Sequence, residues 1–187
     1  MVPLKTKRLI LRDWKAADRE PFARVNADSR VMEYLGEPLA RKQSDDLADR
    51  IETHFRTHQF GFCAAEMIET GLFVGFIGLA VPMFEAAFTP CVEIGWRFAV
   101  EYWGRGLATE GAREVVRHAF EELKLLELVS FTTVGNKRSR RVMEKLGMTR
   151  DPADDFDHPK LPAGHPLRRH VLYRMTRERW CNSAAAQ

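Results

Sequence analysis

The sequence predicts an α+β fold, an α/β sandwich in which helices flank a central sheet that is mixed but mostly antiparallel. Three observations support this prediction. Two amphipathic helical patterns come early, a meander of apolar strand-like runs follows, and a strand–helix–strand unit comes after it. The 187 residues are enough for one domain with a sizeable core. We therefore expect a single domain over residues 6–180 and a C-terminal tail over 181–187.

The first half of the chain contains the early helices and the meander. The predicted helices cover 18–25 and 44–55, and the predicted strands cover 8–12, 60–67 and 72–80. Ser44 stands at the start of the second helical pattern, where a serine hydroxyl commonly accepts a hydrogen bond from a helix amide, so we expect it to be the N-cap. The segment at 69–71, Glu-Thr-Gly, separates two apolar runs and indicates a β-hairpin.

The second half contains the strand–helix–strand unit. Strands are predicted at 92–98, at 128–134, near Met148 and at 171–176, and helices at 107–123 and 139–146. Gly147 follows the second of these helices and is a typical C-terminal stop. The strands on either side of the first helix are expected to form a parallel pair. Residues 151–169 are polar and rich in Pro and Gly, which predicts a long loop.

Composition argues against several classes of function. A net charge of +3 is too small to imply a nucleic-acid partner. No apolar run approaches the roughly 20 residues that span a bilayer, and the N-terminus lacks the apolar region of a signal peptide, so we expect no membrane partner and a cytoplasmic location. The three cysteines are widely spaced, which indicates neither a disulfide framework nor a zinc site. His54 and His58 lack the glutamate of an H-E-x-x-H motif, and we expect no metal.

A glycine-rich loop is the most informative motif. Gly104, Gly106 and Ala108 occupy alternate positions between a strand-like run and a helical pattern. Small residues leave the amides at a helix N-terminus uncrowded, and such a terminus attracts anions through its unpaired N–H groups and its dipole. We therefore expect a pyrophosphate here. A P-loop is not matched because no Lys-Ser or Lys-Thr follows, and a dinucleotide fingerprint is not matched because Thr109 replaces its third glycine.

The segment 103–108, W-G-R-G-L-A, resembles the acetyl-CoA loop of the GNAT N-acetyltransferase superfamily, [Q/R]-x-x-G-x-[G/A]. Trp103 departs from the usual Gln or Arg, and this departure is similar to the RimJ/RimL-like branch of protein N-terminal acetyltransferases. Further segments that resemble this branch occur in the same order at 6–12, 93–96, 136–147 and 170–173. The resemblance covers roughly residues 6–180. It implies an acetyl-CoA-dependent N-acetyltransferase whose parallel strand pair is splayed to admit the cofactor.

The resemblance assigns acetyl-CoA to two adjoining stretches, one that binds the pantetheine arm and acetyl carbonyl and one that binds the pyrophosphate. The implied cofactor-binding residues are Phe98, Ala99, Val100, Gly104, Arg105, Gly106, Leu107, Ala108, Thr109 and Asn136. Asn136 either contacts the CoA arm or caps the following helix. Basic residues at 137–141 and 168–170 either assist the phosphates of CoA or form a solvated face.

Acetyl transfer requires an amine that has lost its proton, a polarised thioester carbonyl and a stabilised thiolate. Glu93 interrupts an apolar strand beside the glycine loop and is the candidate base, with a solvated or ion-paired carboxylate as the alternative. The resemblance makes Ser139 the candidate acid that protonates the CoA sulfur, because the helix at 139–146 contains no tyrosine. The alternative is that Ser139 only caps that helix.

The acceptor is less determined than the cofactor. The resemblance points to a protein N-terminal amine, such as that of a ribosomal protein. A small amine, polyamine, amino acid or antibiotic is the enzymatic alternative, and a non-catalytic acyl-CoA sensor is the other class. Phe84 and Phe88 either line an acceptor pocket or pack internally, and His158 is either a second base or part of a polar loop. We expect a monomer or a homodimer.

Overall fold

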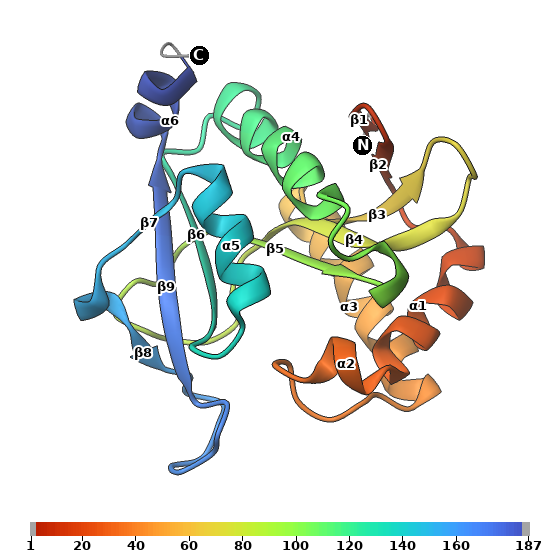
Figure 1. Cartoon of the computed structure of the whole chain (residues 1–187), viewed down its shortest axis with the longest axis horizontal. Coiled ribbons are helices and arrows are strands. Elements are labelled where there is room, and N and C mark those ends of the chain that lie inside the picture. The colour runs from red at the N-terminus through yellow and green to blue at the C-terminus, as the bar shows by residue number, and fades with distance from the viewer. Residues whose placement is uncertain (1–2, 185–187) are drawn as a thin grey trace. The chain divides into compact units, whose positions relative to one another are not determined.

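A computed structural model describes residues 3–184 (Figure 1). Its strands are β1 (Leu4–Lys5), β2 (Leu9–Arg12), β3 (Phe62–Met67), β4 (Phe73–Ala80), β5 (Glu93–Phe98), β6 (Glu127–Thr133), β7 (Thr149–Arg150), β8 (Phe156–Asp157) and β9 (Arg169–Thr176). Its α-helices are α1 (Arg19–Ala27), α2 (Ser29–Met32), α3 (Arg41–His58), α4 (Leu107–Glu121), α5 (Lys137–Leu146) and α6 (Arg177–Ala184). Short 3-10 helices cover Ala16–Asp18, Val100–Tyr102 and Pro152–Asp154.

The predicted fold class is confirmed. The strands follow the order β1-β2-β3-β4-β5-β6-β9-β7, and β8 pairs with β9. The neighbouring strands β1 to β4 are antiparallel, as are β6 and β9. The predicted parallel pair is β5 and β6, joined at Glu93 and Val129. The connection between them contains α4, which is the crossover that a parallel pair requires.

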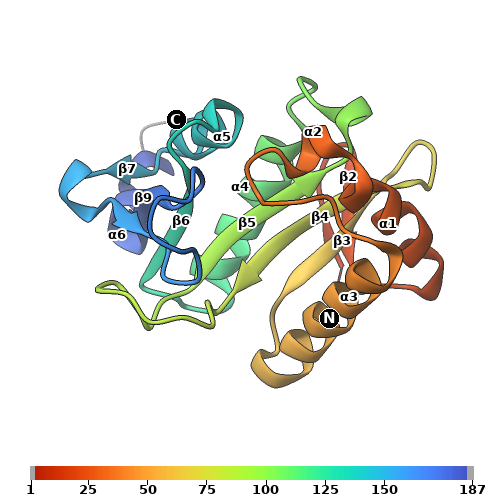
Figure 2. The same cartoon turned by 90° about the horizontal axis from the view of Figure 1, so that it is seen from below.

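The chain divides into two compact units, and the first comprises Met1–Ala80 and Gly95–Val115. In this unit α1 and α3 lie over one face of β2 to β4 (Figure 2), where Phe22 and Phe76 pack with apolar residues of α3. The first turns of α4 lie over the opposite face. A Cβ at Gly111 of α4 would contact Leu9 and Ile77 at 3.4–3.5 Å. The two faces of this part of the sheet therefore meet different helices.

The second unit comprises Val81–Ile94 and Val116–Gln187. Here α5 packs on one face of β6 and β9, where the Tyr173 hydroxyl donates to Glu144 at 3.0 Å. The opposite face carries Val129 and Phe131 of β6, because residues two apart on a strand share a face. The predicted stop at Gly147 is confirmed by its φ of 85°, a left-handed conformation that favours glycine at a helix end.

The predicted N-cap at Ser44 is wrong. Helix α3 starts earlier, at Arg41, and the backbone amide of Ala40 donates to Gln43 at 2.8 Å. Ser44 is a fully buried residue inside the helix, and its hydroxyl accepts a hydrogen bond from Asn26 of α1 at 2.8 Å. A tertiary contact has therefore taken the hydroxyl that local sequence assigned to capping.

The predicted loop at 151–169 is only partly correct, because Phe156–Asp157 pairs with the start of β9 as strand β8. The elements β1, α2 and α6 are absent from the sequence-based prediction. Helix α6 (Arg177–Ala184) begins four residues before the predicted tail at 181 and continues into it. No helix in the described part of the chain is long and apolar enough to cross a membrane.

Asp18→Asn is expected to lower the free energy of unfolding by about 3 kcal/mol, because it breaks a buried ion pair. The Asp18 carboxylate accepts from both terminal nitrogens of Arg12 at 2.7 and 2.9 Å, and only 3% of Asp18 is exposed. Urea unfolding measures the change. Asp46→Asn, which loses an exposed pair with Lys42, serves as the control and should cost below about 1 kcal/mol. Equal losses for the two variants would contradict the prediction.

Candidate functional site

The glycine loop has the backbone that an anion site at a helix start requires. Gly104 and Gly106 adopt φ angles of 72° and 77°, which residues with a Cβ rarely adopt. Helix α4 begins immediately afterwards at Leu107. The amides of the first turn, which include those of Ala108 and Thr109, have no partner within the helix and are available to an anion.

The loop is braced by the N-terminal residues of the chain. The Glu110 carboxylate accepts from the Thr6 hydroxyl at 2.6 Å and forms an ion pair with Arg8 at 2.7 Å. Arg8 also donates to the backbone carbonyl of Arg105 at 2.9 Å. Burial tends to raise the pKa of Glu110, but the hydrogen bonds from Thr6 and Arg8 outweigh it and lower that pKa. Glu110 therefore stays ionised and holds the loop against β2.

The stretch predicted to bind the pantetheine arm lies where β5 ends. The backbone amide of Ala99 donates to the carbonyl of Val74 at 3.0 Å, so that amide is already engaged within the protein. The indole of Trp103 donates to the carbonyl of Phe98 at 2.8 Å, which packs Trp103 beneath the loop. Of the three residues predicted to bind the pantetheine arm, Phe98 and Val100 therefore remain the candidates whose backbone amides would do so.

Glu93 begins β5 and has an unusual environment for a carboxylate. Among the described residues its side chain forms no hydrogen bond or ion pair, and desolvation is the only influence on its pKa. The residue is half-buried, and desolvation by the surrounding protein raises the pKa of its carboxyl to about 8. Cys91 has a pKa raised to about 11, first by burial and then by the charge of Glu93. A carboxyl with a pKa raised in this way suits proton exchange near neutral pH, which is what a general base requires.

The start of α5 separates the roles predicted for Asn136 and Ser139. The Asn136 side chain accepts from the Ser139 amide at 3.1 Å and donates to Thr132 at 3.0 Å. Asn136 is therefore the helix cap, which was one of its two predicted roles. Among the described residues the Ser139 hydroxyl forms no hydrogen bond, so the cap does not occupy it.

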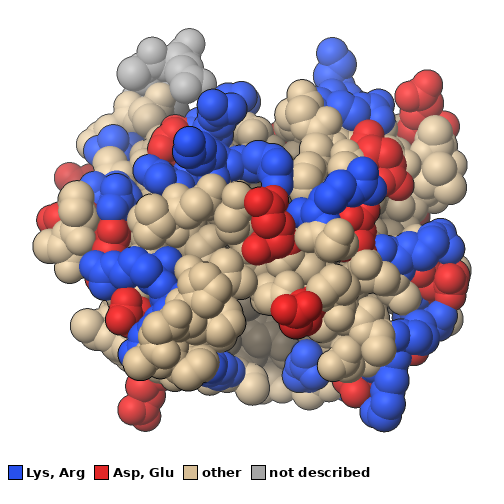
Figure 3. Space-filling model, turned by 60° about the horizontal axis from the view of Figure 1, so that its bottom comes forward, with Lys and Arg blue, Asp and Glu red and all other residues tan. Residues whose placement is uncertain are grey.

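The two basic groups differ in their partners. Arg168 and Arg169 both pair with Asp157, at 3.1 and 3.4 Å, which supports the structural alternative for them. In the helix-start group, Arg140 donates to the Tyr173 hydroxyl and to a backbone carbonyl, whereas Lys137 is exposed. Figure 3 shows basic and acidic side chains interspersed on the visible face, as the small net charge suggests.

Aromatic rings gather on the face of β6 that carries Val129, the pairing partner of Glu93. This aromatic cluster comprises Phe84, Phe88, Phe131, Phe156, His158 and His170. The predicted pair Phe84 and Phe88 is thus in one cluster, with ring centroids 6.2 Å apart. The backbone amide of Lys160 donates to Nδ1 of His158 at 3.3 Å, so that nitrogen's lone pair is engaged. This contact weakens the case for His158 as a second base.

Arg97 is a residue that the sequence analysis missed. It lies on β5, and its Nη1 donates to Asn26 Oδ1 at 2.5 Å. Its Nε is buried and has no hydrogen-bond partner. The available signal was a second charged residue in the apolar strand, four positions after Glu93 and on the same side of the alternation.

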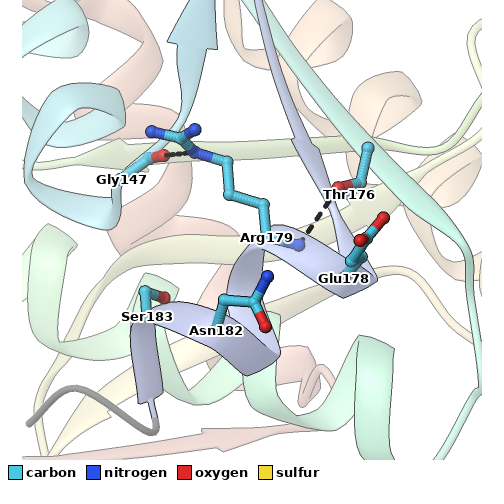
Figure 4. Close-up of a pocket in the computed structure, with 6 residues that line it drawn as sticks. All are labelled: Gly147, Thr176, Glu178, Arg179, Asn182 and Ser183. Atoms are coloured by element: carbon cyan, nitrogen blue, oxygen red, sulfur yellow. Dashed lines mark hydrogen bonds between the residues drawn. The ribbon is translucent and has the colours of Figure 1, made fainter.

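The second unit has a surface depression of about 490 Å³ (Figure 4). Its lining residues are Gly147, Thr176, Glu178, Arg179, Asn182 and Ser183. Arg179 crosses it and donates to the carbonyl of Gly147 at 3.0 Å. None of the predicted site residues lines this depression, so we do not assign the chemistry to it.

Comparisons with known proteins identify similar acetyltransferases. The chain matches the family described as "Acetyltransferase (GNAT) domain" over residues 8–149. It is 36% identical over 186 residues to "FsC-acetyl coenzyme A-N(2)-transacetylase" of Aspergillus fumigatus, covering 95% of this chain and 77% of the relative. It is 26% identical to "Uncharacterized N-acetyltransferase YnaD" of Bacillus subtilis, covering 95% and 98%. A solved acetyltransferase structure from Agrobacterium tumefaciens matches with a TM-score of 0.75, 28% identity and 94% coverage of both chains.

Proposed function

Because the chain belongs to the GNAT acetyltransferase family and is an acetyl-CoA-dependent N-acetyltransferase, we propose that it transfers the acetyl group directly to a primary amine, with Glu93 as base and Ser139 as acid. The observation that carries this proposal is the unpaired carboxyl of Glu93, whose pKa of about 8 suits proton transfer at neutral pH. The unoccupied hydroxyl of Ser139 supports the second role.

The cofactor is proposed to bind along the end of β5 and the start of α4. The amides of the first turn of α4, with those of Gly104, Arg105 and Gly106, would hold the pyrophosphate. The backbone at Phe98 and Val100 would hold the pantetheine arm and polarise the acetyl carbonyl. When bound, acetyl-CoA supplies the activated acetyl group, and the protein supplies orientation and the proton transfers.

The proposed reaction has balanced proton transfers. Glu93 removes a proton from the acceptor ammonium, directly or through water, and the freed amine attacks the thioester carbonyl carbon. The carbon–sulfur bond then breaks, and Ser139 donates its proton to the departing thiolate. The second proton that the nitrogen loses as it becomes an amide returns to the Ser139 oxygen, and the proton held by Glu93 passes to solvent. The products are an amide and CoA. No covalent enzyme intermediate is needed.

Two acceptors are proposed in order. The first is the α-amine of a protein N-terminus, which loses its proton near neutral pH with little help because its pKa is near 8. The second is the amine of a small molecule, and the 36% identical N(2)-transacetylase favours it. We also propose that the enzyme is cytoplasmic and is a monomer or a homodimer.

Thiol release from acetyl-CoA tests this function against a panel of N-terminal peptides and small amines, with acetyl-CoA binding measured in parallel. Turnover with peptides alone supports the first acceptor, and turnover with small amines alone supports the second. Tight binding of acetyl-CoA without turnover on any acceptor would indicate a non-catalytic acyl-CoA sensor instead.

Ser139→Ala is expected to lower kcat by roughly 10- to 100-fold, because the thiolate loses its proton donor. The helix cap should survive, since Asn136 bonds to the backbone amide of this residue and not to its hydroxyl. Steady-state kinetics measures the loss, and an unchanged melting temperature separates it from unfolding. Ser183→Ala, on the distant helix α6, is the matched control and should retain full activity. An unchanged kcat in Ser139→Ala would remove Ser139 from the mechanism.

A further inference from the structure

Arg97 is a half-buried cation without a matching anion. Its Nη1 donates to Asn26 Oδ1 at 2.5 Å, and its guanidinium lies 5.4 Å from the centre of the Phe76 ring. Its Nε is enclosed by protein and unpartnered. Desolvation lowers the pKa of Arg97 to about 10, and no carboxylate among the described residues offsets it. A buried guanidinium normally pairs with a carboxylate, as Arg12 does with Asp18.

The guanidinium is held in place by a buried polar chain. Asn26 is fully buried, and its Nδ2 donates to the equally buried hydroxyl of Ser44 at 2.8 Å. That second bond directs Oδ1 of Asn26 toward Arg97. Nη1 is therefore occupied, and Nε is enclosed by protein, while Nη2 has no hydrogen-bond partner among the described residues. A guanidinium N–H without a partner forms a strong, charge-assisted hydrogen bond with a carboxylate oxygen.

The position of Arg97 shows that an anion bound to it would not be the pyrophosphate of the cofactor. Phe76, which contacts Arg97, belongs to the face of the first unit covered by α1 and α3. The glycine loop leads into α4, which covers the opposite face beside Ile77. The sheet therefore separates Arg97 from the amides proposed to hold the phosphates.

We infer that Arg97, oriented by Asn26 and Ser44, binds a carboxylate of the acceptor. This inference rests on the proposed function, because it names a feature of the molecule that receives the acetyl group. The carboxylate accepts a charge-assisted hydrogen bond from Nη2 of the guanidinium. It belongs either to a small amino acid or to an acidic side chain near a peptide N-terminus.

The test compares acceptors that differ only in this group. One arm offers proteinogenic amino acids beside their amides, and a second offers peptides whose second residue is Asp or Asn. We expect the acid of one arm to be preferred by roughly 10- to 100-fold in kcat/KM, the range of a charge-assisted hydrogen-bonded pair. Equal rates for acid and amide in both arms, with turnover present, would overturn the inference and leave the proposed function intact.

Arg97→Met should abolish that preference by raising KM for the acid, while amide acceptors and acetyl-CoA affinity stay unchanged. Arg97→Gln is the second variant if Arg97→Met does not fold. Arg19→Gln is the matched control, because Arg19 pairs with Asp49 and Glu52 and should leave the preference intact. A preference that persists without the Arg97 guanidinium would also overturn the inference.

A binding measurement keeps the two proposals distinguishable. Calorimetry on the protein saturated with CoA measures the affinity of the N-acetylated amino acids and acidic peptides. Binding to the natural protein but not to Arg97→Met supports the carboxylate site even if no acceptor is turned over, in which case only the catalytic proposal fails. Absence of binding by every acid tested would overturn the carboxylate site.

Discussion

Glu93→Gln is expected to reduce kcat by roughly 100-fold at neutral pH, because the amide cannot accept the proton of the acceptor ammonium. The rate of the natural protein should rise with pH and level off above about 8, where Glu93 is ionised. Steady-state kinetics across this range measures both effects. Glu85→Gln, an exposed carboxylate in the segment before β5, is the matched control and should retain the natural profile.

The stability of the free protein separates Glu93 from the acceptor, whose α-amine also titrates near 8. The pKa of Glu93 is raised in the folded state from its ordinary 4.5, so its contribution to stability is fully present below about 4.5 and is lost as pH rises through 8. The natural protein should therefore lose stability between these values relative to Glu93→Gln. Melting curves at several pH values measure the difference, and parallel curves for the two proteins would refute the raised pKa.

Gly106→Val is expected to weaken acetyl-CoA binding by at least about 100-fold. The residue has a φ of 77°, which a β-branched side chain resists, and the added atoms would stand among the amides proposed to hold the pyrophosphate. A Cβ at this position would lie 3.7 Å from the Arg8 guanidinium, so the protein itself leaves room for it. Calorimetric titration with acetyl-CoA measures the loss.

Gly71→Val is the control for backbone strain in that experiment. Gly71 lies in the β3–β4 hairpin with a φ of 67°, and a Cβ there would meet nothing within 4 Å. Both variants should lose comparable stability, but only Gly106→Val should lose the cofactor. Retained acetyl-CoA affinity in Gly106→Val would show that the pyrophosphate binds elsewhere.

Most of the fold follows from local patterns in the sequence. Apolar periodicity locates β3, β4, β6 and the long helix α4, because burial of one face imposes the period on the residues. The short elements were missed because they contain too few residues to show such a period. Strand β8 has two residues and exists because it pairs with β9, and such a tertiary contact leaves no period in the sequence. Ser44 shows the same limit, since its partner Asn26 lies 18 residues away.

The candidate site was predictable where residue type alone fixes the role. Gly104 and Gly106 are needed for a left-handed backbone at a helix start, and this requirement is visible in the sequence. The state of Glu93 depends on its burial, which the sequence suggested but could not measure. Arg97 could not be found in this way, because its significance is the absence of a counter-charge. That absence appears only when α1 is packed against β5.

Thr6 and Arg8, near the start of the chain, fix the shape of the glycine loop in addition to flanking the edge of the sheet. Strand β1 has two residues and contributes little to the core. A protease cut just after Arg8 would nevertheless detach both partners of Glu110 and the donor to the Arg105 carbonyl. The trimmed protein would keep its fold while its glycine loop lost its fixed shape. Loss of these few residues would therefore lower the affinity of the enzyme for acetyl-CoA.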